Sequence, residues 1–143
     1  MQPHRIETLS VRTSSRNELV DVTDRLRKTV AARKIEAGIL IVYVPHTTAA
    51  VTINENADPD VKSDLLAKLS ELVPKRETYY RHAEGNSDSH LKAAMVGHSV
   101  TVLVEGGELV LGRWQGVYFC EFDGPREREM FVKPVSFRSA AGD

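Results

Sequence analysis

The chain has few cysteines, almost no net charge and no long apolar run, and each of these absences excludes a class of protein. It contains a single cysteine, Cys120, among 143 residues, so it cannot form a disulfide within the chain. Its 19 basic and 20 acidic residues leave a net charge of −1, which gives no bulk attraction to nucleic acid or acidic lipid. No stretch approaches the roughly 18 apolar residues of a membrane span, and no apolar secretion signal opens the sequence. We therefore expect a cytoplasmic protein with no nucleic-acid or membrane partner.

The composition is otherwise that of an ordinary folded domain. Hydrophobic residues make up 41% and charged residues 27% of the chain, close to the average for globular proteins. This length suits one domain, so we expect a single domain over residues 1–143 with a frayed tail at 139–143. Cys120 and Trp114 are both expected in the core, because free cysteines and large aromatic side chains are commonly buried.

Helical signals are present in three segments of the chain. The first predicted helix is capped by Asp21 or Thr23, runs to residue 37 and ends at Gly38, where a left-handed conformation costs little. Its buried stripe consists of Val22, Leu26 and Val30. The third predicted helix is short, covers residues 89–95 and ends at Gly97.

The second predicted helix has the clearest start signal. Asp58 is suited to the N-cap position and Pro59 to the first helical position, and Pro74 is expected to end the helix. The expected core face consists of Val61, Leu65, Leu69 and Leu72.

The remaining apolar segments have the composition of β-strands. Residues 39–44 form a continuous apolar run and are expected to be a central strand covered on both faces. Gly106-Gly107 supplies the positive φ angles of a hairpin turn. Strands are expected near residues 6–11, 18–22, 39–44, 51–53, 100–104, 109–111, 116–122 and 129–137. Sequential hairpins predict a compact α+β domain: mainly antiparallel β-sheet, with two longer helices and one short helix packed on it.

Three polar stretches interrupt this pattern where strands end or helices begin, the usual place for binding groups. The first two contain His46, His82 and His90, and histidine is the commonest metal ligand and general base near neutral pH. His82 and His90 are not a helical pair, so spacing leaves open whether the three share a metal site or are ordinary surface histidines. The helix dipole favours the neutral, ligand-competent form of His90.

Other polar residues are weighed against structural roles. Asp58 and Asp60 are explained by the start of a helix, where acidic side chains cap or stabilise the N-terminus. Asn54 and Glu55 follow a strand, and no structural role accounts for them. The residues expected to move protons are His46, Glu55 and His90. The residues expected to bind substrate or anion are Thr47, Thr48, Asn54, Asn86, Arg113, Gln115 and Arg126; guanidinium groups fit phosphate well.

Taken together, the motifs resemble one family over nearly all of the chain. The three blocks are HTTAAVTINENADPD at 46–60, YRHAEGNSDSHLKAAMVG at 80–97 and GGELVLGRWQGVYFCEFDGPRERE at 106–129. In order and spacing they are similar to the secondary thiamine-phosphate synthase family, also known as an uncharacterised protein family. The resemblance implies a homotrimer with sites near the subunit contacts. It also implies weak thiamine-phosphate synthase activity, which joins hydroxymethylpyrimidine diphosphate to thiazole phosphate with loss of diphosphate, and it favours one shared site for the three histidines.

Two classes of function are compatible with these residues. The first is an enzyme that acts on a phosphorylated or diphosphorylated small molecule with the help of a divalent metal. Three imidazoles favour zinc and a diphosphate favours magnesium, so the metal stays open. The second is a non-catalytic metal- or anion-binding homotrimer that serves as a ligand sensor or scaffold. The metal ligands would be His46, His82 and His90 in either case.

Overall fold

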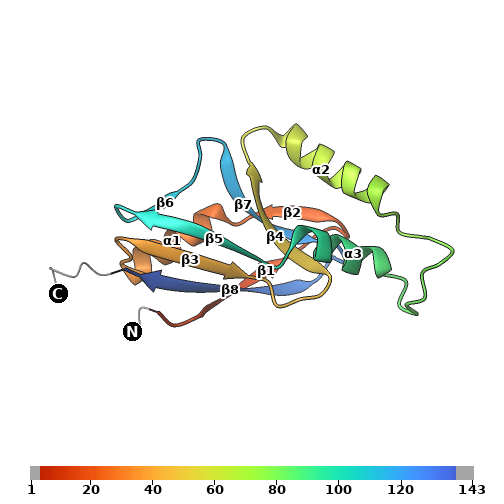
Figure 1. Cartoon of the computed structure of the whole chain (residues 1–143), viewed down its shortest axis with the longest axis horizontal. Helices are drawn as coiled ribbons and strands as arrows, with labels where there is room; N and C mark the ends of the chain where they lie inside the picture. Colours follow the sequence, from red (N-terminus) through yellow and green to blue (C-terminus); the bar gives the residue numbers. More distant parts are fainter. Residues whose placement is uncertain (1–3, 138–143) are drawn as a thin grey trace.

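The computed structural model describes residues 4–137 and consists of two antiparallel sheets and three helices (Figure 1). The strand order is β1-β8-β3-β5-β6 in the first sheet and β2-β7-β4 in the second. The strands are β1 (Glu7–Arg12), β2 (Glu18–Asp21), β3 (Gly38–Tyr43), β4 (Ala49–Glu55), β5 (Ser99–Glu105), β6 (Glu108–Val110), β7 (Gln115–Glu121) and β8 (Glu127–Ser136). The helices are α1 (Thr23–Arg33), α2 (Pro59–Leu72) and α3 (Ser87–Val96). This confirms the predicted α+β class, while the predicted tail at 139–143 lies outside the described residues.

The main core lies between the two sheets and is closed by α1. Successive residues of a strand point to opposite faces, and β7 uses both of its faces in this way. Val117 and Phe119 join the core between the sheets, whereas Tyr118 and Cys120 join a second cluster under α3 and α2. The predicted burial of Cys120 is confirmed, and burial raises the pKa of its thiol to about 12.

The strand that is buried on both faces is therefore β7 and not β3. Strand β3 is central in its sheet, as expected, and Leu40 and Val42 are buried on its inner face. On its outer face, however, Ile39 and Ile41 are only half-buried and Tyr43 is 48% exposed. The prediction of a doubly covered strand at 39–44 was wrong because no helix packs on this face within the described part of the chain.

Helix α1 ends four residues earlier than predicted. Lys34 takes the left-handed conformation with φ 53°, and the N–H of Ile35 then donates to the Val30 carbonyl. This turn directs Ile35, which is 2% exposed, into the core. Gly38 instead opens β3, where a Cβ atom would overlap the Val135 carbonyl of the neighbouring strand β8. The predicted stripe of Val22, Leu26 and Val30 is buried as expected.

The start of α1 also differs from the prediction. Val22 occupies the N-cap position and no side chain caps the helix. Asp21 accepts hydrogen bonds from the N–H and hydroxyl of Thr23, and the Thr23 hydroxyl accepts one from the N–H of Val117. The two predicted capping residues therefore tie the helix start to β7.

Helices α2 and α3 cover the second sheet to different extents. Asp58 is the N-cap of α2, as predicted, and accepts a hydrogen bond from the N–H of Asp60. The predicted core face of α2 is only partly formed: Leu65 and Leu69 pack against the second cluster, but Leu72 is 59% exposed. Helix α3 begins two residues before its predicted start and ends before Gly97, as expected. Among residues 4–137, no helix is long and apolar enough to cross a membrane.

Candidate functional site

A polar cleft of about 470 Å³ lies where the segment between β3 and β4 meets the loop before α3 and the start of β8. Its lining includes all three histidines that the sequence analysis singled out. We call it the histidine cleft, and its lining residues are Pro45, His46, Thr47, Thr48, His82, Glu84, Asn86, His90, Asp123, Arg126 and Arg128.

His46 is anchored to the backbone of β8. Its Nε2 atom lies 3.0 Å from the backbone nitrogen of Glu129. The same Nε2 atom lies 3.1 Å from the carbonyl oxygen of Glu129, so it accepts from the N–H in one tautomer and donates to the carbonyl in the other. Burial and the neighbouring Arg128 guanidinium hold the pKa of His46 below its ordinary value of 6.5. The ring is therefore neutral at neutral pH, and its Nδ1 atom has no hydrogen-bond partner among residues 4–137.

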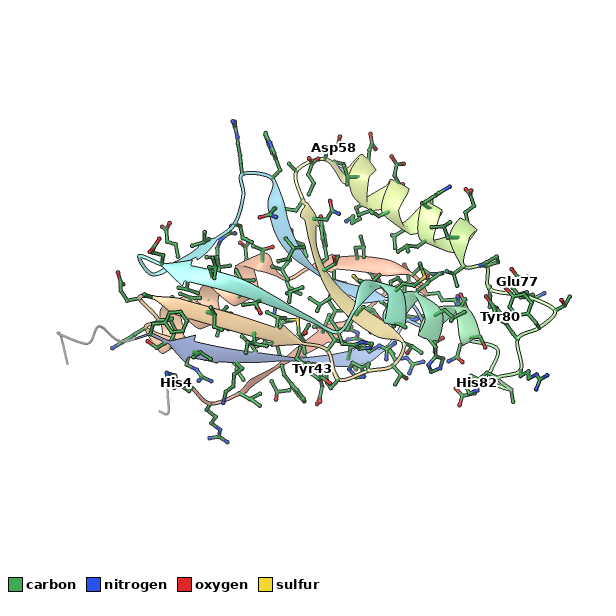
Figure 2. All side chains as sticks on the ribbon, in the orientation of Figure 1. His4, Tyr43, Asp58, Glu77, Tyr80 and His82 are labelled. Carbon is green, nitrogen blue, oxygen red and sulfur yellow. The ribbon has the colours of Figure 1, made fainter. Side chains whose placement is uncertain are left out.

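His82 and His90 form a pair at the opposite side of the histidine cleft. Their rings meet edge to face with centroids 5.2 Å apart. His82 comes from the loop that follows α2, which Figure 2 shows beside α3, and His90 belongs to the first turn of α3. The nearest carboxylate oxygen, from Glu84, is 3.9 Å from Nε2 of His82, too far for a hydrogen bond.

The three histidines share a cleft but do not form a metal centre within this chain. Among residues 4–137, no group of three or more His, Cys, Asp or Glu side chains is placed to hold a metal ion. The backbone of Glu129 already occupies Nε2 of His46. The geometry gives no support to the predicted zinc or magnesium.

Asn86, Asp123 and Arg126 form a hydrogen-bonded chain along one wall. Asn86 Nδ2 donates to Asp123 Oδ2 at 2.8 Å, and Arg126 Nη2 donates to the same oxygen at 3.1 Å. Arg126 Nε also donates to the Asp123 carbonyl. Arg126 is half exposed and keeps further N–H groups for a ligand, while Oδ1 of Asn86 is buried without a hydrogen-bond partner in the described structure.

The floor of the cleft is a buried ion pair that the sequence analysis missed. Arg128 is 4% exposed and Glu121 is fully buried, and the guanidinium binds both carboxylate oxygens. Burial alone would raise the pKa of Glu121, but the hydrogen bonds from Arg128 hold it below its ordinary value. The alternation of strand β8 could have revealed the buried arginine, since Arg128 lies two and four residues before buried Met130 and Val132 and therefore shares their face.

A second buried ionic group supports the start of α3. Asp88, which has no exposed surface, accepts hydrogen bonds of 2.8 and 3.0 Å from Arg16. Lys92, one helical turn later, lies 3.5 Å from the same carboxylate and is 2% exposed. Sequence reasoning missed these residues as well, because Arg16 and Asp88 are far apart along the chain. The group fixes the helix that carries His90.

Four of the predicted site residues lie elsewhere, namely three predicted binding residues and Glu55, which was predicted to move protons. Asn54 and Glu55 end β4, whereas Thr48 precedes its start, and seven residue steps in a strand span roughly 20 Å. Arg113 and Gln115 lie beside them, because Gln115 pairs with Glu55 across β7 and β4. The Gln115 side chain accepts a hydrogen bond from Gly112, so it stabilises a turn. None of the four lines the histidine cleft.

Trp114 lies on that same distant turn and is 53% exposed, so its predicted place in the core was wrong. The Arg113 guanidinium lies 4.7 Å from the centre of its ring. The turn between Gly112 and Gln115 carries the side chain outward instead of into either hydrophobic cluster.

A second cavity of about 590 Å³ adjoins the cleft and shares His82 and His90 with it. Its other lining residues are mainly aromatic and apolar, and they belong to the loop after α2 and to α3. They are Tyr79, Tyr80, Arg81, Ser87 and Leu91.

The fold and the cleft describe a small α+β protein with a polar site at the loops that connect its two antiparallel sheets. Residues 7–136 match the model of the family described as UPF0047 protein YjbQ-like. The chain is 50% identical over 125 residues to the UPF0047 protein MJ1081 of Methanocaldococcus jannaschii, covering 87% of this chain and 90% of that one. It is 48% identical over 128 residues to YugU of Bacillus subtilis, covering 90% and 97%. The chain belongs to the YjbQ/UPF0047 family.

Solved structures agree with this assignment. A YjbQ/UPF0047 family protein from Clostridium acetobutylicum superimposes with a TM-score of 0.88 at 46% identity, covering 90% of this chain and 99% of that one. A YbjQ-like protein from Sulfolobus solfataricus gives a TM-score of 0.88 at 32% identity, covering 93% and 97%. The resemblance to secondary thiamine-phosphate synthases was wrong, since the matched family and relatives carry the UPF0047 name and none points to that activity.

Proposed function

We propose that the chain binds a phosphorylated small molecule in the histidine cleft and acts on it as an enzyme. The observation that carries the proposal is the gathering of His46, Thr47 and Arg126 around one polar cavity. The neutral imidazole of His46 leaves Nδ1 without a protein partner within residues 4–137, and Arg126 offers N–H groups that Asp123 does not use. Hydroxyl and guanidinium donors beside an imidazole suit phosphate oxygens.

The neighbouring cavity supplies space for the rest of the ligand. It lies directly beyond the His82–His90 pair and is lined by Tyr79, Tyr80 and Leu91. A phosphate held in the histidine cleft would place an attached organic group next to these side chains. His90, at the boundary between the two cavities, is then the candidate for moving a proton at the bond between phosphate and organic group.

Binding of pyrophosphate tests the proposal. Calorimetric titration of the protein with inorganic pyrophosphate should give saturable binding. Arg126→Ala should weaken binding by at least about tenfold, equivalent to about 1.4 kcal/mol. Arg113→Ala is the matched control, since Arg113 lies on the distant turn and should leave the affinity unchanged. Equal loss in both variants, or no binding by the wild type, would refute the proposed site.

Turnover separates this enzyme from a second candidate, a binding protein without chemistry. The engagement of His46 Nε2 by the Glu129 backbone favours that candidate, since this nitrogen is not free to accept a substrate proton. Incubation with a panel of phosphorylated metabolites, followed by detection of released phosphate or pyrophosphate, distinguishes them. Tight binding without turnover by any ligand would favour the binding protein.

The proposal includes association of the chain as a homotrimer. Support comes from the outer face of the first sheet, where opposite residues on paired strands share a face. Tyr43 stacks on Phe131 there, and Leu103 is 56% exposed. The apolar residues on this face are Ile39, Ile41, Tyr43, Leu103, Val110, Phe131 and Val135. The same face also carries Thr101 and Lys133 opposite Ile41. A group of partly exposed apolar side chains with polar neighbours is typical of an interaction surface.

Light scattering coupled to size exclusion tests the assembly. The expected mass is three times the 15.9 kDa of the chain, and Leu103→Lys should lower it by placing a charge on the apolar face. A wild-type dimer would contradict the trimer, and a monomer at micromolar concentration would contradict association itself. The cytoplasmic location expected from the sequence stays a prediction.

A further inference from the structure

The buried ion pair under the histidine cleft holds three separate segments of the chain. Arg128 Nη2 donates to both the hydroxyl and the carbonyl oxygen of Thr48, at 2.8 and 3.3 Å. Glu121 accepts a hydrogen bond of 3.0 Å from the N–H of Asp123 and one of 2.8 Å from the Thr13 hydroxyl. The pair therefore joins the segment before β4, the turn after β7 and the end of β1.

Each of these segments carries or contacts a group that faces the cleft. Thr48 follows His46 and Thr47 in the segment between β3 and β4. Asp123 accepts the hydrogen bonds from Asn86 and Arg126 described above. The Thr13 hydroxyl also accepts a hydrogen bond from the N–H of Arg126. All donors that we assign to ligand binding are thus attached to one buried pair.

We infer that Arg128, paired with Glu121, is a positioning residue of the histidine cleft that holds the 46–48 segment and the Arg126 turn in the arrangement that receives a phosphorylated ligand. The choice of ligand rests on the proposed function, whereas the positioning role is independent of it. A buried ion pair is often no more stabilising than hydrophobic residues of the same volume. Fold stability alone therefore does not explain a charged pair here, but a requirement for fixed geometry does.

Arginine is required at this position by the geometry of its contacts. The planar guanidinium reaches the two Glu121 oxygens and Thr48 at the same time. A lysine ammonium is a compact charge on a flexible stem and cannot reproduce this fork. Arg128→Lys should keep the charge and lose the geometry.

The charges around His46 make the inference testable without any ligand. Arg128 lowers the pKa of His46, while Glu121 and Glu129 oppose that effect. The other ionisable groups that line the cleft are His82, Glu84, His90, Asp123 and Arg126. If the ion pair holds its geometry beside His46, removal of the positive partner raises the pKa of His46 and removal of the negative partner lowers it.

The experiment is an NMR titration of the histidine ring signals in the ligand-free protein. We expect the pKa of His46 to rise in Arg128→Gln and to fall in Glu121→Gln. Arg12→Gln is the matched control, because it removes an exposed ion pair with Glu127 at the neighbouring strand β1 and should leave His46 unchanged. A general loosening of the fold would instead move His46 in the same direction in both buried variants. That result, or no shift in either, would overturn the inference.

The conservative variant covers the case in which the glutamine variants do not fold. Arg128→Lys should keep the pKa of His46 near the wild-type value and weaken pyrophosphate binding by at least about tenfold, or about 1.4 kcal/mol. Wild-type affinity in Arg128→Lys would overturn the positioning role. If the wild type binds no pyrophosphate, the proposed function fails, and the ligand-free titrations of Arg128→Gln and Glu121→Gln decide the inference by themselves.

Discussion

Replacement of Asp88 by Asn should destabilise the protein strongly. Asp88 has no exposed surface, and its carboxylate is bound by both terminal nitrogens of Arg16 and lies 3.5 Å from Lys92. Asp88→Asn keeps the shape of the side chain but leaves two cations without their buried counter-charge. Breaking a buried pair by removing one partner costs about 3–5 kcal/mol. Since small domains are stable by about 5–15 kcal/mol, the melting temperature should fall by roughly 10–20 °C.

Urea denaturation followed by circular dichroism measures this loss. Asp24→Asn is the matched control, because the ion pair of Asp24 with Arg27 is exposed and such pairs contribute about 0–1 kcal/mol. A loss in Asp88→Asn below about 1 kcal/mol, or one equal to the control, would refute the reasoning, since buried pairs that matter exceed that value.

The pH dependence gives the same prediction a second check. Burial alone would raise the pKa of Asp88, but the hydrogen bonds and charge of Arg16 and the charge of Lys92 lower it below its ordinary value. The pKa is therefore lower in the folded than in the unfolded protein. The stabilisation is fully present above the unfolded pKa and is lost as pH falls through the folded pKa. Below about pH 4, the ordinary range for Asp, the stability of the wild type should fall more steeply than that of Asp88→Asn.

Three further predictions concern the scaffold. Asp58→Ala should lower the free energy of unfolding by about 0.5–2 kcal/mol, because it removes the hydrogen bond to the N–H of Asp60; an unchanged urea midpoint would contradict this. Gly38→Ala should cost more than about 2 kcal/mol, because its Cβ overlaps the Val135 carbonyl, whereas Gly85→Ala meets no atom and should cost only about 1 kcal/mol of backbone strain. The Cys120 thiol, with a pKa of about 12 from burial, should react with a disulfide reagent only after unfolding; a rapid reaction of the native protein would contradict its burial.

Much of the fold follows from local signals in the sequence. The N-cap at Asp58, the glycine pair at 106–107 and the alternation of Val100, Val102 and Val104 each act over a few residues, and each element formed as expected. Such signals indicate the backbone conformation of a segment and which face of the helix or strand is apolar and therefore buried. They do not report what covers the opposite face. For that reason the sequence could not distinguish β7, buried on both faces, from β3, whose outer face is apolar but open.

The candidate site shows the same division. The sequence by itself determined that His46, His82 and His90 stand in polar segments at the ends of elements, because hydrophobic periodicity stops there. Only the tertiary structure decided which polar segments meet: it joined these histidines to Asn86 and Arg126 and carried Arg113 and Gln115 to the far end of β7. It also paired Arg128 with Glu121 and Arg16 with Asp88. Residues that are distant along the chain are brought together by the order and register of the strands. A short segment of sequence does not reveal either, because both depend on which strands pair with one another.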